Sequence, residues 1–351
     1  MHPEDPLQQR DTRRRRRLHP RLFLAALVAV AAVAVAAVVP GLVRSHSKPI
    51  GTGVVLIETN LAYQGAQAAG TGMVLTSSGE VLTNNHVIKG ATELKVEVPS
   101  TGRSYNAEVV GYDVKDDVAV LQLRGASDLQ TVSLGHSGDV GIGDSVLALG
   151  NAGGTGRLTP ASGTVTRVNR AITVSDDQGG SESLSGLIET DAAVRPGDSG
   201  GPLLNSSGEV IGMDTAASAS NPGDVSMSNS QGYAIPIDKA LSIANQITSG
   251  NDSATVHVGG TAFLGVLAET SSYGTSGAVV TQVVSGSPAE AAGMVPGDVI
   301  TSVGGYTVSS PNDLSAVIAT QKPGASVSAV YYDQYGTAQE TSFTLGSGPP
   351  R

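Results

Sequence analysis

Ser199 lies in the run Gly197-Asp198-Ser199-Gly200-Gly201-Pro202, in which glycines surround a hydroxyl that could act as a nucleophile. Glycine permits a tight loop whose backbone N–H groups converge on one point with no Cβ in the way. The N–H groups of Gly197 and Ser199 could then stabilise an oxyanion that forms beside the hydroxyl. The run therefore predicts acyl transfer on Ser199, with an oxyanion hole formed by Gly197 and Ser199.

Acyl transfer at neutral pH also requires a base that accepts the proton and an acid that orients the base. Among six histidines, His86 ends an apolar, strand-like run, whereas the others lie in terminal segments or among turn residues. Asp117 stands immediately before the apolar run 118–121, so a strand entering the core would carry its carboxylate inward. We expect His86 to be the base and Asp117 the acid; Asp113 and Asp116 are the neighbouring alternatives.

The composition indicates that many short strands, rather than long helices, position these side chains. The chain has 351 residues, 45 of them glycine, and short apolar runs recur between Gly, Asn, Asp and Ser. This spacing predicts an antiparallel sandwich or barrel, so we expect a mainly β protein, and the length suggests two domains. The absence of cysteine excludes disulfides and thiol catalysis, and without a clustered set of His, Asp and Glu we expect no cofactor or metal.

The first 50 residues differ from the rest in charge and hydropathy. Residues 13–17 are five arginines, and residues 22–39 are uninterrupted Ala, Val, Leu and Phe. A membrane-spanning helix needs about 20 such residues, and positive charge before it keeps the N-terminus in the cytoplasm. We therefore expect a basic cytoplasmic tail (1–21), a retained transmembrane anchor (22–43) and a tether (44–50). A cleaved signal peptide is the main alternative, and a buried soluble helix is another.

Beyond residue 48 the chain is acidic, with 12 Lys or Arg against 28 Asp or Glu. Such a surface would repel phosphates, so nucleic-acid binding is not expected. The strand-like runs and the three chemical groups fall within 51–248, and a polar linker follows at 249–258. A second, smaller domain is expected over 259–347, with a tail at 348–351.

Taken together, these residues resemble one family of proteases. The order His86, Asp117, Ser199 is that of the chymotrypsin-like fold, which implies two six-stranded β-barrels with the triad in the cleft between them. More closely, the chain resembles the HtrA (DegP-like) branch of bacterial serine proteases, which implies an extracytoplasmic enzyme and a homotrimer built by the protease domains. The motifs that carry the resemblance are Thr83-Asn84-Asn85-His86-Val87-Ile88, Asp117-Val118-Ala119-Val120-Leu121, Thr190-Asp191-Ala192-Ala193, the Ser199 run and Gly232-Tyr233-Ala234-Ile235-Pro236.

The segment before the nucleophile departs from this family and bears on specificity. The family usually has Asn where this chain has Arg195, and often Asn where it has Asp198, so what holds the oxyanion hole open is an open question. Arg195 either pairs with an acidic neighbour or faces solvent. In this fold, the residues five and six before Ser199 line the S1 pocket, which implies Val194 and Ala193. Neither is charged, which predicts a small or medium apolar P1 residue.

Ala262-Phe263-Leu264-Gly265-Val266 resembles the carboxylate-binding loop of a PDZ domain. The backbone N–H groups of such a loop could capture a C-terminal carboxylate while the peptide adds a strand to a sheet edge. A helix expected over 312–320 could line the groove with apolar side chains, which could equally be domain core. The residues expected to bind peptide are Phe263, Leu264, Gly265, Val266 and Leu314.

The leading hypothesis is a serine endopeptidase that degrades or processes misfolded or exported proteins outside the cytoplasmic membrane. Its expected partners are unfolded or damaged protein substrates, peptide C-termini at the PDZ domain, and the membrane. A chaperone or peptide-binding protein with secondary or conditional proteolysis is the alternative, and an esterase is a third reading. The intact set of His86, Asp117 and Ser199 favours the protease.

Overall fold

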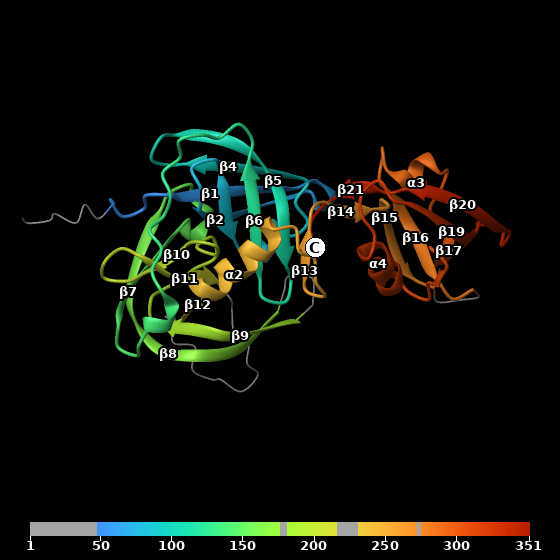
Figure 1. Cartoon of the computed structure of the whole chain (residues 1–351). Helices are drawn as coiled ribbons and strands as arrows, with labels where there is room; N and C mark the ends of the chain where they lie inside the picture. Colours follow the sequence, from blue (N-terminus) through green and yellow to red (C-terminus); the bar gives the residue numbers. More distant parts are fainter. Residues whose placement is uncertain (1–47, 176–180, 216–230, 272–274) are drawn as a thin grey trace, which may run out of the picture. The chain divides into compact units, whose positions relative to one another are not determined.

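The computed structural model describes residues 48–175, 181–215, 231–271 and 275–351 (Figure 1). The transmembrane anchor expected over 22–43 lies outside these residues. Within the described ranges, no helix combines the length and the apolar character that crossing a membrane requires.

The first half of the protease region is a β-barrel. Strands β5-β4-β1-β2-β3-β6 are hydrogen-bonded in that order, and β6 pairs back with β5, which closes a ring of six antiparallel strands. Residues alternate between the inside and the outside along each strand, so the apolar positions of the sequence fill the interior. The strands are β1 (Val54–Leu61), β2 (Ala66–Val74), β3 (Glu80–Thr83), β4 (Glu93–Val98), β5 (Arg103–Asp113) and β6 (Val118–Leu123).

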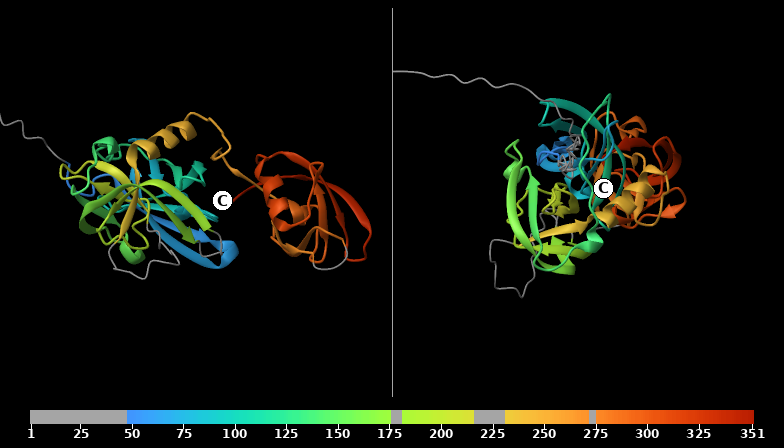
Figure 2. Two further views of the ribbon diagram at one scale, coloured as in Figure 1. Left: turned by 90° about the horizontal axis from the view of Figure 1, so that it is seen from below. Right: turned by 60° about the vertical axis from the view of Figure 1, so that its left-hand side comes forward.

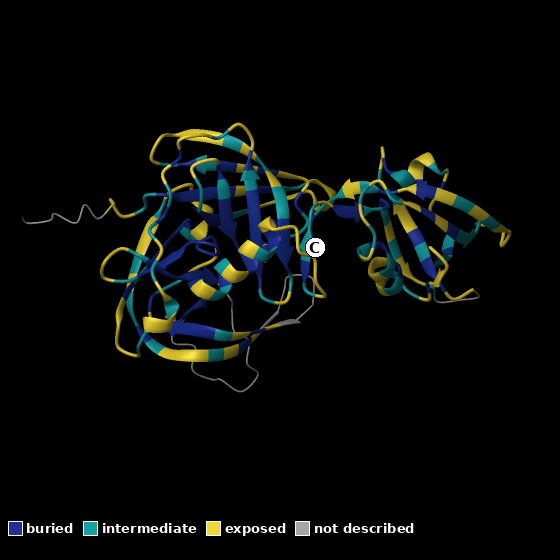
Figure 3. Ribbon diagram, in the orientation of Figure 1, coloured by how far each residue is buried: buried dark blue, intermediate teal, exposed yellow. Residues whose placement is uncertain are grey.

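A second closed barrel follows, with the order β10-β11-β12-β9-β8-β7. One buried cluster contains Met73 and Leu82 of the first barrel together with Met213 and Ile235 of the second, so the two barrels share part of one core. Buried residues are dark blue on the strands in Figure 3. The two six-stranded rings match the expected mainly β architecture. The strands are β7 (Ser145–Gly150), β8 (Thr159–Ser175), β9 (Ser181–Thr190), β10 (Pro202–Leu204), β11 (Val210–Thr215) and β12 (Gly232–Pro236).

Helix α2 (Ile237–Thr248) follows β12 and packs against β11, β5 and β6 (gold in Figures 1 and 2). The segment expected to be a linker, 249–258, ends in strand β13 (Val256–Val258), which pairs with residues 111–113 at the end of β5. Thr255 Oγ1 also donates to Asp113 Oδ2 at 2.8 Å. The segment 249–258 is polar, so its composition did not predict a strand. Strand β13 forms through pairing with β5, which lies more than a hundred residues away in the sequence.

The C-terminal domain is a small antiparallel sheet covered by two helices. The strands of the sheet are hydrogen-bonded in the order β15-β16-β17-β19-β20. The core of the domain contains Leu314, Ile318 and Phe343. Strand β18 (Tyr306–Thr307) pairs with β17, and β14 (Thr261–Phe263) pairs with β21 (Gly346–Gly348). The remaining elements are β15 (Val266–Thr270), β16 (Ala278–Val283), α3 (Pro288–Ala291), β17 (Val299–Val303), α4 (Pro311–Ala319), β19 (Ser326–Tyr332) and β20 (Ala338–Thr344).

Candidate active site

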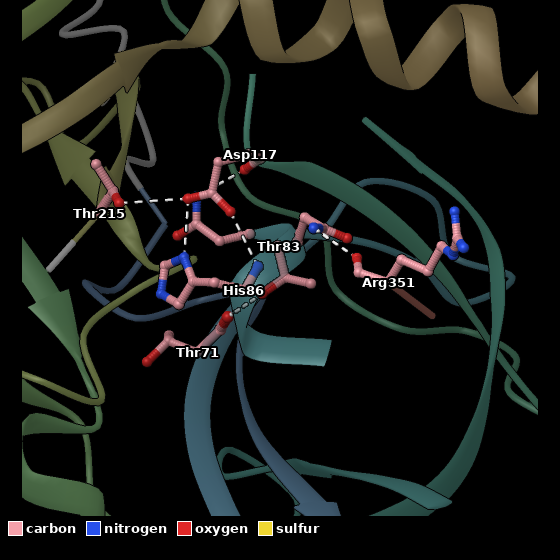
Figure 4. Close-up of polar contacts among 8 residues, drawn as sticks. Thr71, Thr83, His86, Asp117, Thr215 and Arg351 are labelled. Carbon is pink, nitrogen blue, oxygen red and sulfur yellow. Dashed lines mark hydrogen bonds and ion pairs between the residues drawn. The ribbon is translucent and has the colours of Figure 1, made fainter. Parts of the chain in front are cut away.

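Asp117 binds His86 at two points (Figure 4). Helix α1 (Asn85–Ile88) directly follows β3 and carries His86, and Asp117 directly precedes β6, the strand paired with β3. Asp117 Oδ1 accepts the main-chain N–H of His86 at 2.9 Å, and Oδ2 lies 2.8 Å from Nδ1 of the ring. The carboxylate is 2% exposed and the imidazole 39% exposed. Nδ1 is thus held as a donor, which leaves Nε2 to act as an acceptor.

The backbone of Asp117 adopts a left-handed conformation, with φ +54°. Such a conformation is uncommon for a residue with a Cβ, and it persists only where the surroundings fix it. Asn84 Nδ2 donates to the Asp117 carbonyl at 2.9 Å, and Thr215 Oγ1 makes a longer contact of 3.4 Å to Oδ2 (Figure 4). The main chain of Asp117 is therefore held by Asn84, and its carboxylate is held by His86 and Thr215.

The two alternative aspartates have other partners. Asp113 Oδ1 accepts the N–H of Asp116 at 3.0 Å, which closes the turn between β5 and β6. Asp116 forms an ion pair with Lys239 of α2, with 2.7 Å between Oδ1 and Nζ. Neither contacts His86 through its side chain, so the structure pairs His86 with Asp117 among these three.

Ser199 is 4% exposed and lies in a loop that enters the second barrel at β10. Gly197 has φ +98°, and a Cβ on it would fall 2.2 Å from the Asn151 carbonyl oxygen, so only glycine fits. Its N–H donates to no other group in the described part of the chain. This free N–H adjoins the nucleophile candidate, as an oxyanion hole requires.

Four successive carbonyls of this loop are each tied by a hydrogen bond. The Pro196 carbonyl accepts the N–H of Gly153 at 2.7 Å, and the Asp198 carbonyl accepts the N–H of Gly201 at 2.9 Å. The carbonyls of the two oxyanion-hole candidates, Gly197 and Ser199, both accept from Thr71 of β2. A peptide whose carbonyl is fixed has its N–H fixed in the opposite direction. The loop therefore has one defined arrangement of donors.

Asp198 makes two hydrogen bonds with the main chain of Arg195 in the same loop. Its Oδ2 accepts the main-chain N–H of Arg195 at 2.9 Å, while its own N–H donates to the Arg195 carbonyl at 2.9 Å. The aspartate thus supports the loop from within the same turn. The Arg195 side chain is exposed and forms no ion pair among the described residues. Of the two alternatives considered for Arg195, the structure has the solvent-facing one.

Asp214 is a residue of this region that the sequence analysis did not single out. It lies in β11 at 0% exposure, its N–H donates to the Gly201 carbonyl and its carbonyl accepts the N–H of Gly200, both at 2.8 Å. Burial raises the pKa of its carboxyl well above the usual range, and the charge of Asp198 raises it further. A charged residue ending the apolar run 210–213 was the signal that could have revealed it.

Two residues expected to line the S1 pocket, Ala193 and Val194, are half-buried between β9 and the Ser199 loop. Gly232, the first residue of β12, lies against Val194: a Cβ there would fall 2.5 Å from Val194 Cγ2. A larger residue at position 232 would displace Val194, and both expected pocket residues are uncharged. An apolar surface of this kind suits an apolar side chain.

The expected carboxylate-binding loop lies between β14 and β15. The Leu264 carbonyl accepts the N–H of Ala289 at 3.0 Å, and the Gly265 carbonyl accepts that of Val284 at 2.9 Å. The N–H groups of Leu264 and Gly265 donate to nothing in the described residues, so they are available to a ligand. Phe263 ends β14 and Val266 begins β15.

Helix α4 packs against β15, and its Leu314 is 5% exposed within the domain core. The expected groove residue is therefore mostly core in this structure, as is Ile318 at 7%. The described residues contain no cluster of three or more metal-ligating side chains.

The chain is similar to known protein families and to known serine proteases. Residues 70–213 match the model of the trypsin-like peptidase domain, and residues 279–331 match that of the PDZ domain. The chain is 33% identical over 318 residues to the serine protease PepD of Mycobacterium tuberculosis, an alignment covering 88% of this chain and 66% of that protein. It is 34% identical over 265 residues to the periplasmic pH-dependent serine endoprotease DegQ of Escherichia coli, covering 74% and 56%. A solved structure of the HtrA-type protease AlgW with tripeptide is 28% identical, covers 86% of this chain and 95% of its own, and has a TM-score of 0.48.

The fold and the site define a trypsin-like serine peptidase domain followed by a PDZ domain. The chain spans between about half and two thirds of the length of these curated relatives. It belongs to the HtrA (DegP-like) family of serine proteases.

Proposed function

We propose that this chain is a serine endopeptidase whose nucleophile is Ser199, with His86 as general base and Asp117 as the acid that orients it. The two-point contact of Asp117 with His86 is the observation that carries the proposal, because it fixes both the tautomer and the direction of the imidazole. Family membership supplies independent support.

The reaction follows from these roles. Ser199 Oγ attacks the scissile carbonyl while Nε2 of His86 takes its proton, and the resulting imidazolium is stabilised by the buried Asp117 carboxylate. The N–H groups of Gly197 and Ser199 stabilise the tetrahedral oxyanion, where one donor is typically worth about 3–4 kcal/mol. The imidazolium then protonates the leaving amine, and water releases the acyl group by the same steps in reverse order.

Substrate selection would use two separate surfaces. Ala193 and Val194 would receive a small or medium apolar P1 side chain, because neither offers a partner for a charge. The free N–H groups of Leu264 and Gly265, flanked by Phe263 and Val266, would bind the C-terminal carboxylate of a peptide. The protease domain would occupy 51–248 and the PDZ domain 259–347.

The proposed location of the enzyme is supported by the sequence before the fold and by the names of its relatives. Residues 22–43 would anchor the chain in the cytoplasmic membrane, with both domains outside, where relatives named periplasmic endoproteases also work. The substrates would be misfolded or exported proteins, and the protease domains would form a homotrimer. Membrane fractionation of the full chain, compared with a chain lacking residues 1–44, tests the anchor.

Digestion of casein by wild type and by Ser199→Ala tests the activity. The proposal expects digestion by wild type and none by the variant. Equal digestion by both would refute the assignment of Ser199. Suppression of aggregation by both proteins, with digestion by neither, would instead support the chaperone alternative.

A further inference from the structure

One hydroxyl connects the nucleophile loop to the rest of the protease domain. Thr71 lies in β2 at 0% exposure, and its Oγ1 donates to the Gly197 carbonyl at 2.7 Å. The same Oγ1 accepts the N–H of Asn151 at 2.9 Å. The main-chain N–H of Thr71 donates to the Ser199 carbonyl, also at 2.9 Å. The hydroxyl therefore uses both its donor and an acceptor position, and it joins three segments that are far apart in the sequence.

The hydrogen bond to Gly197 bears directly on the oxyanion hole. Gly197 lies between two peptide planes, and the first is fixed where the Pro196 carbonyl accepts from Gly153. The second is fixed where the Gly197 carbonyl accepts from Thr71, and that carbonyl has no other donor among the described residues. The N–H of Gly197 belongs to the first plane, while the second plane carries the N–H of Asp198, which also donates to the Arg195 carbonyl. Because glycine rotates more freely than any other residue, the position of Gly197 between the two planes depends on both being held.

The main chain of Thr71 is also held in place. Its carbonyl accepts from Thr83 Oγ1 at 2.7 Å, and a Cβ on Gly200 would fall 2.2 Å from that carbonyl oxygen (Figure 4 shows Thr71 and Thr83). The hydroxyl is thus presented from a strand of the closed first barrel, a rigid support for a positioning group.

We propose that Thr71 is a positioning residue for the peptidase reaction, whose hydroxyl holds Gly197 in the conformation that aims its N–H at the oxyanion. The inference rests on the proposed function, since it assigns a role within that reaction. Thr71 acts through Gly197 and does not touch the substrate. Its role is therefore visible in transition-state stabilisation and not in substrate binding.

Two substitutions separate the hydroxyl from the rest of the side chain. Thr71→Val keeps the shape and removes both hydrogen bonds of Oγ1, whereas Thr71→Ser keeps the hydroxyl and removes a methyl. The full-length wild type, both variants and Ser199→Ala are compared by peptide hydrolysis and by the inhibition constant of a peptide aldehyde. The aldehyde forms a tetrahedral adduct with Ser199 whose oxygen occupies the oxyanion hole.

For Thr71→Val, kcat is expected to fall by about 10- to 100-fold, which is no more than the fall caused by removing one oxyanion-hole donor. The KM is expected to stay within about twofold of wild type. The aldehyde inhibition constant is expected to rise by the same factor as kcat falls, because both report the oxyanion. The pH midpoint of kcat/KM stays at its wild-type value, since the His86–Asp117 pair is untouched. Thr71→Ser is expected to restore kcat to within about threefold.

A kcat for Thr71→Val within twofold of wild type would overturn the inference, as would equal losses for Val and Ser. A fall in kcat with no change in aldehyde affinity would also overturn it. If circular dichroism shows that Thr71→Val does not fold, Thr71→Ala replaces it with the same expected outcomes. Failure of the proposed function looks different: wild type itself would not hydrolyse the peptide, or Ser199→Ala would hydrolyse it equally well.

Discussion

Asp214 is fully buried behind the nucleophile loop, and the negative charge of Asp198 acts on its carboxyl. Neither oxygen of Asp214, nor Oδ1 of Asp198, makes a hydrogen bond with the described residues, although the nearby Leu149 N–H favours the ionised form of Asp214 and lowers its pKa. Burial therefore dominates, and the pKa of Asp214 lies well above its value in an unfolded chain.

The raised pKa predicts how stability depends on pH. Above about pH 4, the unfolded chain releases the Asp214 proton while the folded chain retains it, so folding loses stability as pH rises toward the folded pKa. Asp214→Asn removes this contribution and should be more stable than wild type at pH 7, by about 1–3 kcal/mol. The advantage should shrink toward pH 3, where wild type is protonated in both states.

Urea unfolding followed by circular dichroism between pH 3 and pH 8 measures this difference. Asp113→Asn provides the contrast: both Asp113 oxygens accept hydrogen bonds, from Asp116 and Thr255, so this variant should be less stable at pH 7. An Asp214→Asn variant that is destabilised by the same amount at every pH would contradict the account.

The orienting role of Asp117 predicts a large kinetic defect in Asp117→Asn. The asparagine amide would face Nδ1 of His86 and favour the wrong tautomer, so kcat should fall by about 10³- to 10⁴-fold. KM and folding should change little. Peptide hydrolysis measures the effect, with Asp116→Asn as control, because Asp116 pairs with Lys239 and not with His86. A loss of less than tenfold for Asp117→Asn would exclude it as the orienting acid.

The S1 residues predict selectivity for apolar side chains. In matched peptides, kcat/KM after Val or Ala should exceed that after Arg by at least about 100-fold, since a desolvated guanidinium would find no partner beside Ala193 and Val194. Gly232→Ala should lower kcat/KM for Val more than for Ala, because its Cβ would crowd Val194. Preference for Arg would refute this assignment of the pocket.

The loop between β14 and β15 predicts carboxylate-dependent peptide binding. An apolar peptide with a free C-terminus should bind at least about tenfold more tightly than its amidated form, since charge-assisted hydrogen bonds would be lost. Gly265→Val should abolish binding, because Gly265 has φ +86° and a Cβ there would fall 2.1 Å from Ser287 Cβ. Fluorescence polarisation with labelled peptides measures both. Equal affinity for the two peptide forms would contradict carboxylate capture by the loop.

The sequence allowed most of the architecture to be anticipated because its motifs are local. The glycines around Ser199 and the strand that follows Asp117 are read directly from neighbouring residues. The short apolar runs indicated an antiparallel sandwich or barrel, and the resemblance to the chymotrypsin-like fold implied two barrels. Thr71 could not be found in this way, because its partners Gly197 and Asn151 are 126 and 80 residues away. Strand β13 was not predicted from the sequence for the same reason, since its pairing with β5 is set by tertiary structure.

Labelling with a fluorophosphonate, followed by mass spectrometry of the adduct, tests the central claim most directly. An activated serine reacts with this probe because its base removes the hydroxyl proton and the oxyanion hole receives the phosphonate oxygen. We predict a single adduct on Ser199 in wild type, none in Ser199→Ala, and much slower labelling in Asp117→Asn. Undiminished labelling of Ser199→Ala, or an adduct on a different residue, would contradict the account.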